Sequence, residues 1–453
     1  MVYMKEKKKK RIKKLNQVHY IALGFLAIII VGTFLLMLPF ASKAGESTTL
    51  LGALVTATSS TCVTGLVAYD TYTHWTLFGQ VVLLILIQIG GLGFITIGVA
   101  FSMLFRRHIG LRQRDLLKES VNAIEIGGIL KLWRKIILGT LLFEGVGAAL
   151  LSIRFIKDFG VAKGIWYGVF HSISAFCNGG FDLMGTKEKF SSFTAYVDDP
   201  LVIITLSVLI LVGGLGFLVW DDLAKNKLHW KRYTLHTKIV ITMLFVLVAA
   251  GTLLMYVMEK NVTIASMDTS GKFLASLFGA VTARTAGFNS VDTGALSPGG
   301  KMVTIILMFI GGNPGSTAGG VKTTTVAVIL AYIYANVRGN SGCNMFGRRI
   351  GDEVIKKAAL VFSLNLILAL ISSIVIMATN PLSFDDVIFE VVSAVSTVGM
   401  TTGITRDLNV VGQITITILM YCGRIGSMTF ALSLIQRPDA QLTTYPEEKV
   451  TIG

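Results

Sequence analysis

Eight long apolar runs dominate this 453-residue sequence, and they decide the environment in which it folds. A helix needs ~20 apolar residues to cross the ~30 Å core of a bilayer. Only 15% of the residues are charged, against about 25% in soluble domains. A soluble protein could bury eight such runs only in an unusually large dry core, so we expect an all-α integral membrane protein. The runs lie at 19–40, 80–105, 136–153, 201–220, 238–258, 302–335, 355–378 and 410–435.

The charges between the runs predict the topology. Of the 41 Lys and Arg residues, 28 fall in the segments on the side of the N-terminus and 11 on the opposite side. Lys and Arg favour cytoplasmic loops, so we expect both termini in the cytoplasm of a cell-membrane protein with a retained first span. The net charge of +15 then requires no nucleic acid, because anionic membrane lipid or a cytosolic partner is a sufficient counterpart.

A Gly-centred tetrapeptide occurs once in each of the four outside segments. Glycine is always at the third position, and the separations are similar. One such tetrapeptide is an ordinary loop, but four at matched places indicate an internal repeat. The four are Val63-Thr64-Gly65-Leu66, Asn178-Gly179-Gly180-Phe181, Thr285-Ala286-Gly287-Phe288 and Thr397-Val398-Gly399-Met400.

Each tetrapeptide follows an apolar segment that is too short to cross a membrane and is typical of a re-entrant helix. We expect these helices at 47–60, 164–176, 270–284 and 383–396. The unit is therefore span, pore helix, glycine loop, span, and four tandem copies surround one pore. The chain divides into a basic N-terminus (1–18), pore repeats (19–105, 136–221, 238–335, 354–435), cytoplasmic loops (106–135, 222–237, 336–353) and a cytoplasmic tail (436–453).

Four glycine loops around one axis suit a potassium ion. Backbone carbonyls can replace the hydration shell of potassium, and Thr397-Val398-Gly399 matches the start of the TVGYG filter. Glycine permits the positive φ angles that inward-pointing carbonyls require. The pore helices also end with their negative dipole ends toward the loops. The predicted filter residues are Val63, Thr64, Gly65, Asn178, Gly179, Gly180, Thr285, Ala286, Gly287, Thr397, Val398 and Gly399.

The sixth apolar run contains a proline and five glycines at mid-membrane, which predicts a break at 311–320. An unwound segment there could be a gate beneath the glycine loops, or only a packing kink. Two cations lie in the matching region, and intramembrane charge usually marks a function or a partner. Arg424 could bond the freed carbonyls, repel cations or have only a structural role. The predicted gate residues are Gly311, Gly312, Asn313, Pro314, Gly315, Ser316, Thr317, Ala318, Gly319, Gly320, Lys322 and Arg424.

Several other features allow two interpretations. Asp70, Asp182, Asp292 and Asp407 follow the four glycines and could form a cation-concentrating vestibule or merely solubilise loops. The run Gly315 to Thr323 lacks the GxxxxGK[ST] spacing of a phosphate-binding loop. The Gly-Gly-Leu-Gly-Phe segments that begin at Gly90 and Gly213 predict close helix approach.

These glycine loops, the run 312–322 and Gly423-Arg424-Ile425-Gly426 together resemble the Trk/Ktr/HKT superfamily of potassium transporters, most of all the membrane subunits of bacterial Ktr systems. The resemblance implies potassium as the transported ion, a filter with all four glycines, and a gate that is held closed partly by Arg424. It also implies a homodimer, sodium stimulation and a cytosolic KtrA/KtrC-like ring that binds ATP and ADP. This sequence has Gly179 where alanine is frequent.

Three alternatives stay open. One is a sodium-selective member of the same family, and another is an alternating-access transporter, although the repeats are parallel rather than inverted. The third is a membrane enzyme, which we do not expect because Glu144 and Glu390 are isolated and His171 has no evident partner.

Overall fold

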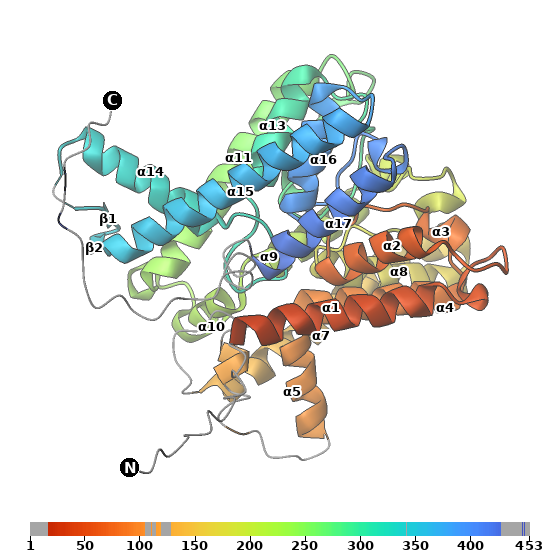
Figure 1. The fold of residues 1–453 in the computed structure, drawn as a ribbon, viewed down its shortest axis with the longest axis horizontal. Helices are drawn as coiled ribbons and strands as arrows, with labels where there is room; N and C mark the ends of the chain where they lie inside the picture. Colours follow the sequence, from red (N-terminus) through yellow and green to blue (C-terminus); the bar gives the residue numbers. More distant parts are fainter. Residues whose placement is uncertain are drawn as a thin grey trace, which may run out of the picture.

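The computed structural model describes residues 17–104, 110, 115–118, 128–340, 342–426, 446 and 448. Residues 1–16, most of the loop 106–127, the end of the eighth predicted span and nearly all of the tail lie outside the described residues. The described part is almost entirely helical (Figure 1). Its only strands are β1 (Asn344–Met345) and β2 (Arg348–Arg349), which form a small antiparallel hairpin.

The helices repeat in the predicted order of outer helix, pore helix and inner helix. Unit 1 contains α1 (Gln17–Leu36), α2 (Leu50–Cys62), α4 (Leu77–Leu92) and α5 (Phe94–Leu104). Unit 2 contains α7 (Ile129–Phe159), α8 (Val161–Phe176), α9 (Pro200–Gly214) and α10 (Phe217–Asn226). Unit 3 contains α11 (Leu235–Glu259), α12 (Thr269–Thr282), α13 (Pro298–Phe309) and α14 (Thr323–Val337). Unit 4 contains α15 (Asp352–Thr379), α16 (Phe384–Val395) and α17 (Val410–Ile425).

Short helical turns shape the connections between these helices. One of them, α3 (Thr71–His74), is α-helical and is capped by Asp70. The 3-10 turns are η1 (Pro39–Ala41), η2 (Met184–Thr186), η3 (Thr194–Tyr196), η4 (Trp230–Arg232) and η5 (Ile404–Arg406).

Side-chain caps fix where the inner helices start. A capping oxygen satisfies one of the amide groups that the first turn leaves unpaired. Proline at the first helical position adds a preset φ in two of them, α9 and α13. The caps of α4, α9, α13 and α17 are Thr76, Asp199, Ser297 and Asn409.

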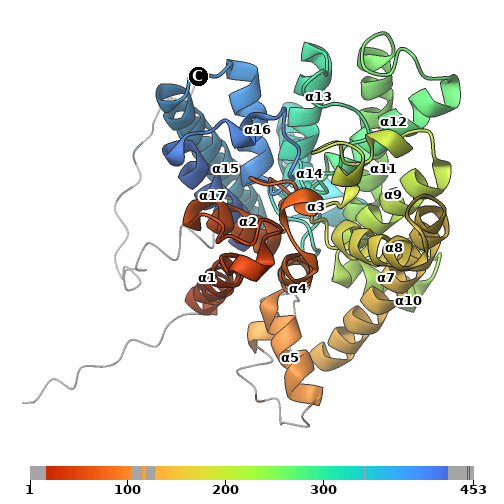
Figure 2. The ribbon, with the colours of Figure 1, turned by 90° about the vertical axis from the view of Figure 1, so that its right-hand side faces the viewer.

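The four units form a closed ring in sequence order, as Figure 2 shows along an axis through their centre. The inner helix of each unit packs against the pore helix of the next unit. These contacts are α4 with α8, α9 with α12, α13 with α16, and finally α17 with α2, which closes the ring. The pore helices are therefore enclosed by protein, and their middle residues are buried.

The outer helices are continuous, whereas the inner helices are interrupted. The outer helices α1, α7, α11 and α15 are each long and apolar enough to cross a bilayer. The pairs α4–α5 and α9–α10 satisfy the same test together but bend by 99° and 95°. The break predicted in the sixth run is present, since α13 ends at Phe309 and α14 begins at Thr323.

The fourth predicted span, 201–220, is bent between α9 and α10. Its bend, like that in the second span, occurs at a glycine with positive φ, and the same dihedral angles end α17. The φ angles are 82° at Gly93, 97° at Gly216 and 93° at Gly426. A residue with a Cβ is strained in this conformation, so one glycine suffices to end the helix.

The inner helices approach the pore helices closely, as predicted from the Gly-Gly-Leu-Gly-Phe segments. A Cβ on Gly90 would collide with the carbonyl oxygen of Thr61 at the end of α2. In unit 2, a Cβ on Gly213 would collide with the carbonyl oxygen of Phe176. In unit 4, a Cβ on Gly423 would collide with the carbonyl oxygen of Val395. The three carbonyls occupy equivalent positions, two residues before the start of each glycine tetrapeptide.

We predict that Gly90→Ala lowers the unfolding temperature of the detergent-solubilised protein. The added methyl group must push α4 away from α2, and overpacking of this kind costs ~1–3 kcal/mol. Gly145→Ala on α7 is the matched control, because no atom lies within 4 Å of its added Cβ. Equal melting temperatures for the two variants would contradict the proposed contact.

Candidate functional site

The four tetrapeptides share an unusual backbone conformation. The first residue of each is not glycine, yet it has a positive φ, and the glycine at the third position also has one. Positive φ is a genuine outlier for β-branched residues, and such strain concentrates at functional sites. The φ angles are 55° at Val63, 60° at Asn178, 76° at Thr285 and 51° at Thr397, and 99° at Gly65, 68° at Gly180, 81° at Gly287 and 92° at Gly399.

The four third-position glycines touch one another in a closed circuit. A Cβ on Gly65 would lie 2.9 Å from the carbonyl oxygen of Gly179 and 3.0 Å from the Cα of Gly180. A Cβ on Gly180 would lie 2.7 Å from the carbonyl oxygen of Ala286. A Cβ on Gly287 would meet the carbonyl oxygen of Val398, and one on Gly399 would meet that of Thr64, which completes the ring. Only hydrogen atoms fit between these loops.

Hydroxyl groups on the pore helices hold the loops, and sequence reasoning missed them. In units 1 and 4, Ser59 and Ser393 accept hydrogen bonds from the amides of Gly65 and Gly399, both at 3.0 Å. In units 2 and 3, Ser174 and Thr282 donate to the carbonyl oxygens of the fourth tetrapeptide residues, Phe181 and Phe288, both at 2.8 Å. A hydroxyl five or six residues before each glycine was a signal available in the sequence.

His171 supports the second loop, which corrects the expectation that it has no partner. Its Nε2 accepts a hydrogen bond from the amide of Leu183 at 2.9 Å. Its Nδ1 lies 2.7 Å from the carbonyl oxygen of Tyr167 and must therefore carry the proton. The imidazole is thus a neutral structural bridge between α8 and the chain beyond the loop.

Beneath the loops, residues 310–322 form a compact irregular segment, called the intramembrane loop below. Its ends are joined by a parallel bridge between Ile310 and Val321. The amide of Thr323 donates to the carbonyl oxygen of Gly312 at 3.0 Å. The Lys322 ammonium folds back onto the carbonyl oxygen of Ala318 at 2.7 Å. The segment therefore supplies partners for backbone groups that the helix break releases.

Unit 2 anchors one side of the intramembrane loop. The Asn313 side chain donates to the carbonyl oxygen of Gly214 at 2.7 Å, and the amide of Thr317 donates to that of Gly213 at 3.3 Å. The amide of Phe217 donates to the carbonyl oxygen of Gly315 at 2.8 Å. The bend between α9 and α10 thus provides the backbone groups that bind the loop.

Arg424 of unit 4 fastens the other side. Its Nη1 donates to the carbonyl oxygen of Thr317, and its Nη2 donates to the carbonyl oxygens of Gly90 and Gly91 in unit 1. One guanidinium therefore ties together units 1, 3 and 4 at the level of the helix breaks. Of the roles considered for Arg424, bonding of freed carbonyls is confirmed.

The intramembrane loop also touches the glycine ring above it. A Cβ on Gly319 would collide with the Thr397 side chain, and one on Gly320 would lie 3.0 Å from the Cα of Ser396. At its other end, a Cβ on Gly311 would lie 3.4 Å from a methyl group of Thr285. The glycines of the loop therefore let it pack directly against the tetrapeptides of units 3 and 4.

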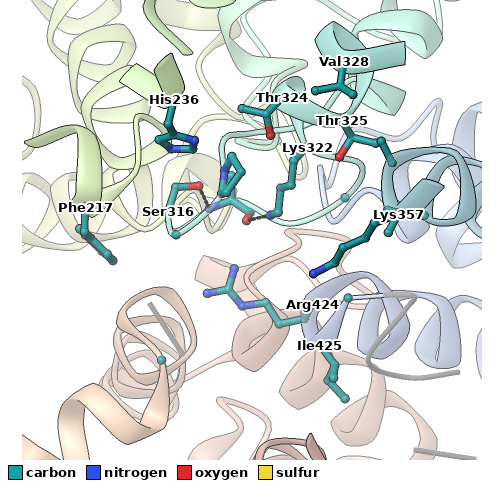
Figure 3. Close-up of a pocket in the computed structure, with 18 of the residues that line it drawn as sticks. Phe217, His236, Ser316, Lys322, Thr324, Thr325, Val328, Lys357, Arg424 and Ile425 are labelled. Atoms are coloured by element: carbon teal, nitrogen blue, oxygen red, sulfur yellow. Dashed lines mark hydrogen bonds between the residues drawn. The ribbon is translucent and has the colours of Figure 1, made fainter. Parts of the chain in front are cut away.

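A cavity of about 670 Å³ opens on the other side of the intramembrane loop. Figure 3 shows three cationic side chains around it, Lys322 from the loop, Lys357 from α15 and Arg424 from α17. The lining also includes the bend residues Gly93 and Gly426. The cavity is therefore positively charged at the place where the loop separates it from the glycine ring.

The sequence that folds into this geometry is similar to those of known transport proteins. The sequence profile of the TrkH family, described as cation transport protein, matches residues 3–445. The chain belongs to the TrkH family. It is 39% identical to the potassium/sodium uptake protein NtpJ of Enterococcus hirae, over 98% of this chain and 99% of that protein. It is 38% identical to the Ktr system potassium uptake protein B of Bacillus subtilis, over 96% of each chain.

A solved member confirms the fold of this TrkH-family chain. The crystal structure of the potassium transporter TrkH from Vibrio parahaemolyticus superposes with a TM-score of 0.72 at 17% sequence identity. The match covers 95% of this chain and 86% of that one. The prediction of four helix–pore-loop–helix repeats in a multi-pass membrane protein is thereby confirmed.

The four acids that follow the glycines of this TrkH-family chain do not form one set. Asp70 is buried, where it caps α3 and accepts a hydrogen bond from the amide of Phe190 at 3.0 Å. Asp182 is half-buried and accepts from the amide of Met184. Asp292 and Asp407 are exposed, and Asp292 lines a cavity of about 530 Å³ on the far side of the ring. The idea of a vestibule fits Asp292, whereas Asp70 is structural.

The two isolated glutamates are both buried beside the ring. Glu144 on α7 accepts a hydrogen bond from Gln88 of α4 at 3.0 Å, behind Cys177. Glu390 on α16 accepts from the hydroxyls of Thr401 and Thr405, which follow the fourth tetrapeptide. Glu144 thus joins α7 to α4, and Glu390 joins α16 to the segment that follows the fourth tetrapeptide.

We predict that Ser59→Ala destabilises the protein more than Ser60→Ala. Both hydroxyls are buried, but the Ser59 side chain binds the Gly65 amide, whereas Ser60 bonds to Thr56 within its own helix. An amide left unsatisfied in a buried loop costs ~1–3 kcal/mol. Thermal unfolding of the two purified variants measures the difference, and a lower melting temperature for Ser60→Ala would refute the assignment.

Proposed function

We propose that this chain is the pore-forming subunit of a bacterial potassium uptake system, with a filter of four glycine loops. The single observation that carries the proposal is the closed circuit of third-position glycines, which places the backbones of four loops around one axis. Backbone carbonyls in such a ring can replace the hydration shell of a potassium ion. The names of the relatives in Enterococcus hirae and Bacillus subtilis, both potassium uptake proteins, support the choice of ion.

The filter comprises the first three residues of each tetrapeptide. Its glycines accept the positive φ and the close backbone contacts that other residues cannot accept. Glycine in all four loops favours potassium, because the resemblance associates serine in the first loop with sodium transport. A sodium-conducting pore is the second candidate, since one relative is named a potassium/sodium uptake protein.

We predict that Gly65→Ser lowers the preference for potassium over sodium by roughly ten-fold or more, a loss of about 1.4 kcal/mol. The serine Cβ would lie 2.9 Å from the carbonyl oxygen of Gly179 and would displace the adjacent loop. Rubidium uptake into proteoliposomes, with sodium as competitor, measures the preference. Gly45→Ser is the control, because Gly45 also has a positive φ but no atom lies within 4 Å of its added Cβ.

Unchanged selectivity in Gly65→Ser would remove the filter assignment and would favour an alternating-access transporter with its site elsewhere. A wild-type protein that takes up sodium as readily as rubidium would instead support the sodium-selective alternative. The two outcomes are distinguishable because the first concerns the variant and the second concerns the wild type.

The intramembrane loop is the proposed gate, and the residues 311–320, Lys322 and Arg424 act together in it. The loop lies between the glycine ring and the cation-lined cavity, so a potassium ion that leaves the filter meets it first. Lys322 and Arg424 add a repulsive field in a low-dielectric setting, where charges interact strongly. Opening therefore requires the loop to leave its anchors on units 2 and 4.

We predict that Arg424→Ala raises the basal rate of rubidium flux, on the order of ten-fold. The change removes three part-buried charge-assisted hydrogen bonds that hold the loop and the inner helix of unit 1, each of which is worth ~1.5–3 kcal/mol. A variant that lacks residues 313–319 should leak rubidium in the same way, and this result does not depend on a single side chain. Tyr421→Phe, which removes a hydrogen bond from the same helix to Ala22, is the control. Flux that stays at the wild-type rate in both gate variants would disprove the gate.

The topology and partners follow from the same proposal. Both termini and the loops 106–135, 222–237 and 336–353 face the cytoplasm, and the four pore repeats keep the boundaries expected from the sequence. Three relatives are named as proteins of a Ktr system, which supports a homodimer regulated by a cytosolic KtrA/KtrC-like ring that binds ATP or ADP. Sodium stimulation belongs to the same proposal. The pore requires no organic cofactor and no enzymatic step.

A further inference from the structure

Two connecting segments at one end of the molecule present an exposed apolar cluster that the pore does not use. They are the segment 227–234, between α10 and α11, and the hairpin segment 342–351, between α14 and α15. The rings of Trp230 and Phe346 meet across the two segments with centroids 6.1 Å apart. Leu228 beside them is 95% exposed. Leu228, Trp230 and Phe346 are called the apolar tip below. The hairpin of β1 and β2 lies at the left-hand end of the molecule in Figure 1.

The hairpin keeps its aromatic residue in the tip at a conformational cost. Asn344 pairs with Arg349 and Met345 with Arg348, so Phe346 and Gly347 alone form the turn. Their φ angles are 50° and 73°, and a two-residue turn with two positive φ angles favours Asn-Gly. A bulky residue is an outlier in the first of these positions. Asparagine would make this turn with less strain than phenylalanine. The strain therefore indicates that Phe346 occupies the position because of the contacts that its ring makes.

The other half of the apolar tip is held in place by part-buried hydrogen bonds. Tyr233 is buried, and its hydroxyl donates to the carbonyl oxygen of Lys227. The amide and hydroxyl of Thr234 both donate to the Asp222 carboxylate, at 3.0 and 2.9 Å. Leu228 and Trp230 therefore project from a fixed segment, and their exposure is a property of the folded chain.

The surroundings of the apolar tip are strongly basic. Residues 223–234 and 342–351 contain no acidic residue. The acids next to the first segment are engaged within the fold, because Asp221 pairs with Lys135 and Lys225, and Asp222 caps the segment. Asp352 and Glu353 follow the hairpin in the first turn of α15. Six exposed cations surround the tip: Lys225, Lys227, Lys231, Arg232, Arg348 and Arg349.

We propose that the apolar tip and these cations form a docking surface for anionic phospholipid headgroups in the leaflet at this end. Tryptophan and other aromatic residues favour the membrane–water interface, and neighbouring Lys and Arg bind anionic headgroups. The surface continues the lipid-facing side of the fold. The helices α11 and α15 start at Leu235 and Asp352, and Val354 of α15 already exposes 51% of its surface. A leucine that is almost fully exposed beside such helices is stabilised by insertion among lipids.

None of the three apolar-tip residues lines the cavity beside the intramembrane loop, so the test of the docking surface does not rely on transport. The full-length protein is reconstituted in vesicles that contain phosphatidylcholine and phosphatidylglycerol, with bromine on the acyl chains of one lipid or the other. The emission of Trp230 is obtained as the difference between wild type and Trp230→Phe. We expect brominated phosphatidylglycerol to quench this emission about two-fold more than brominated phosphatidylcholine, because each nearby Lys or Arg favours anionic lipid.

The triple variant Lys227→Ala, Lys231→Ala and Arg232→Ala should reduce this preference to nearly one. The control is Lys157→Ala, Lys163→Ala and Lys260→Ala, which removes three exposed lysines at the other end of the outer helices and should keep the preference. Absence of quenching by either lipid would overturn the proposal and would favour a protein partner on the tip. Equal quenching by both lipids in the wild type would overturn the anionic preference.

Discussion

The contact between the four third-position glycines constrains the whole architecture. Each glycine lies where a Cβ would strike the backbone of the next loop, so the loops form a ring only if their supports place them to within a few tenths of an ångström. The supports are the pore helices, which lie inside the protein and end at the ring. Because irregular backbone at membrane depth must be buried or line a cavity, the four outer helices and the neighbouring inner helices enclose the pore helices on all sides.

The inner helices must approach the pore helices closely and then end near the glycine ring. Glycines such as Gly90, Gly213 and Gly423 let them approach the last carbonyls of the pore helices, and positive-φ glycines a few residues later turn the chain aside. Units 1 and 2 use a single glycine for the turn, and an equivalent glycine ends α17 of unit 4, whereas unit 3 expands this position into the intramembrane loop. The loop is thus an elaboration of a position that every unit already uses as a break. Its partners are the equivalent positions of units 1, 2 and 4, which explains why residues so distant in sequence meet there.

Much of this arrangement could be predicted from the sequence. The spacing of the glycine tetrapeptides indicated four units, and Pro314 with its glycines located the break in the sixth run. The bends at Gly93 and Gly216 were missed because a single glycine within a long apolar run is also compatible with close helix packing. Positive φ at Val63 or Thr397 could not be predicted, because tertiary contacts there overcome the preference of β-branched residues. The partner of His171 depends on a loop that returns to the pore helix, which local patterns do not reveal.

The balance between carbonyls and cations gives the proposed gate its physical basis. A broken helix at membrane depth frees carbonyl oxygens, and an isolated free carbonyl is costly in an apolar setting. Arg424 and Lys322 satisfy these oxygens while the loop is closed, so their charges compete with a permeating cation for the same ligands. In the proposed filter, by contrast, the pore-helix hydroxyls bind loop amides and fourth-residue carbonyls. The other carbonyl oxygens of the proposed filter are therefore left to bind cations. In the proposed filter and gate, closure and conduction therefore differ in which positive charge the backbone oxygens bind.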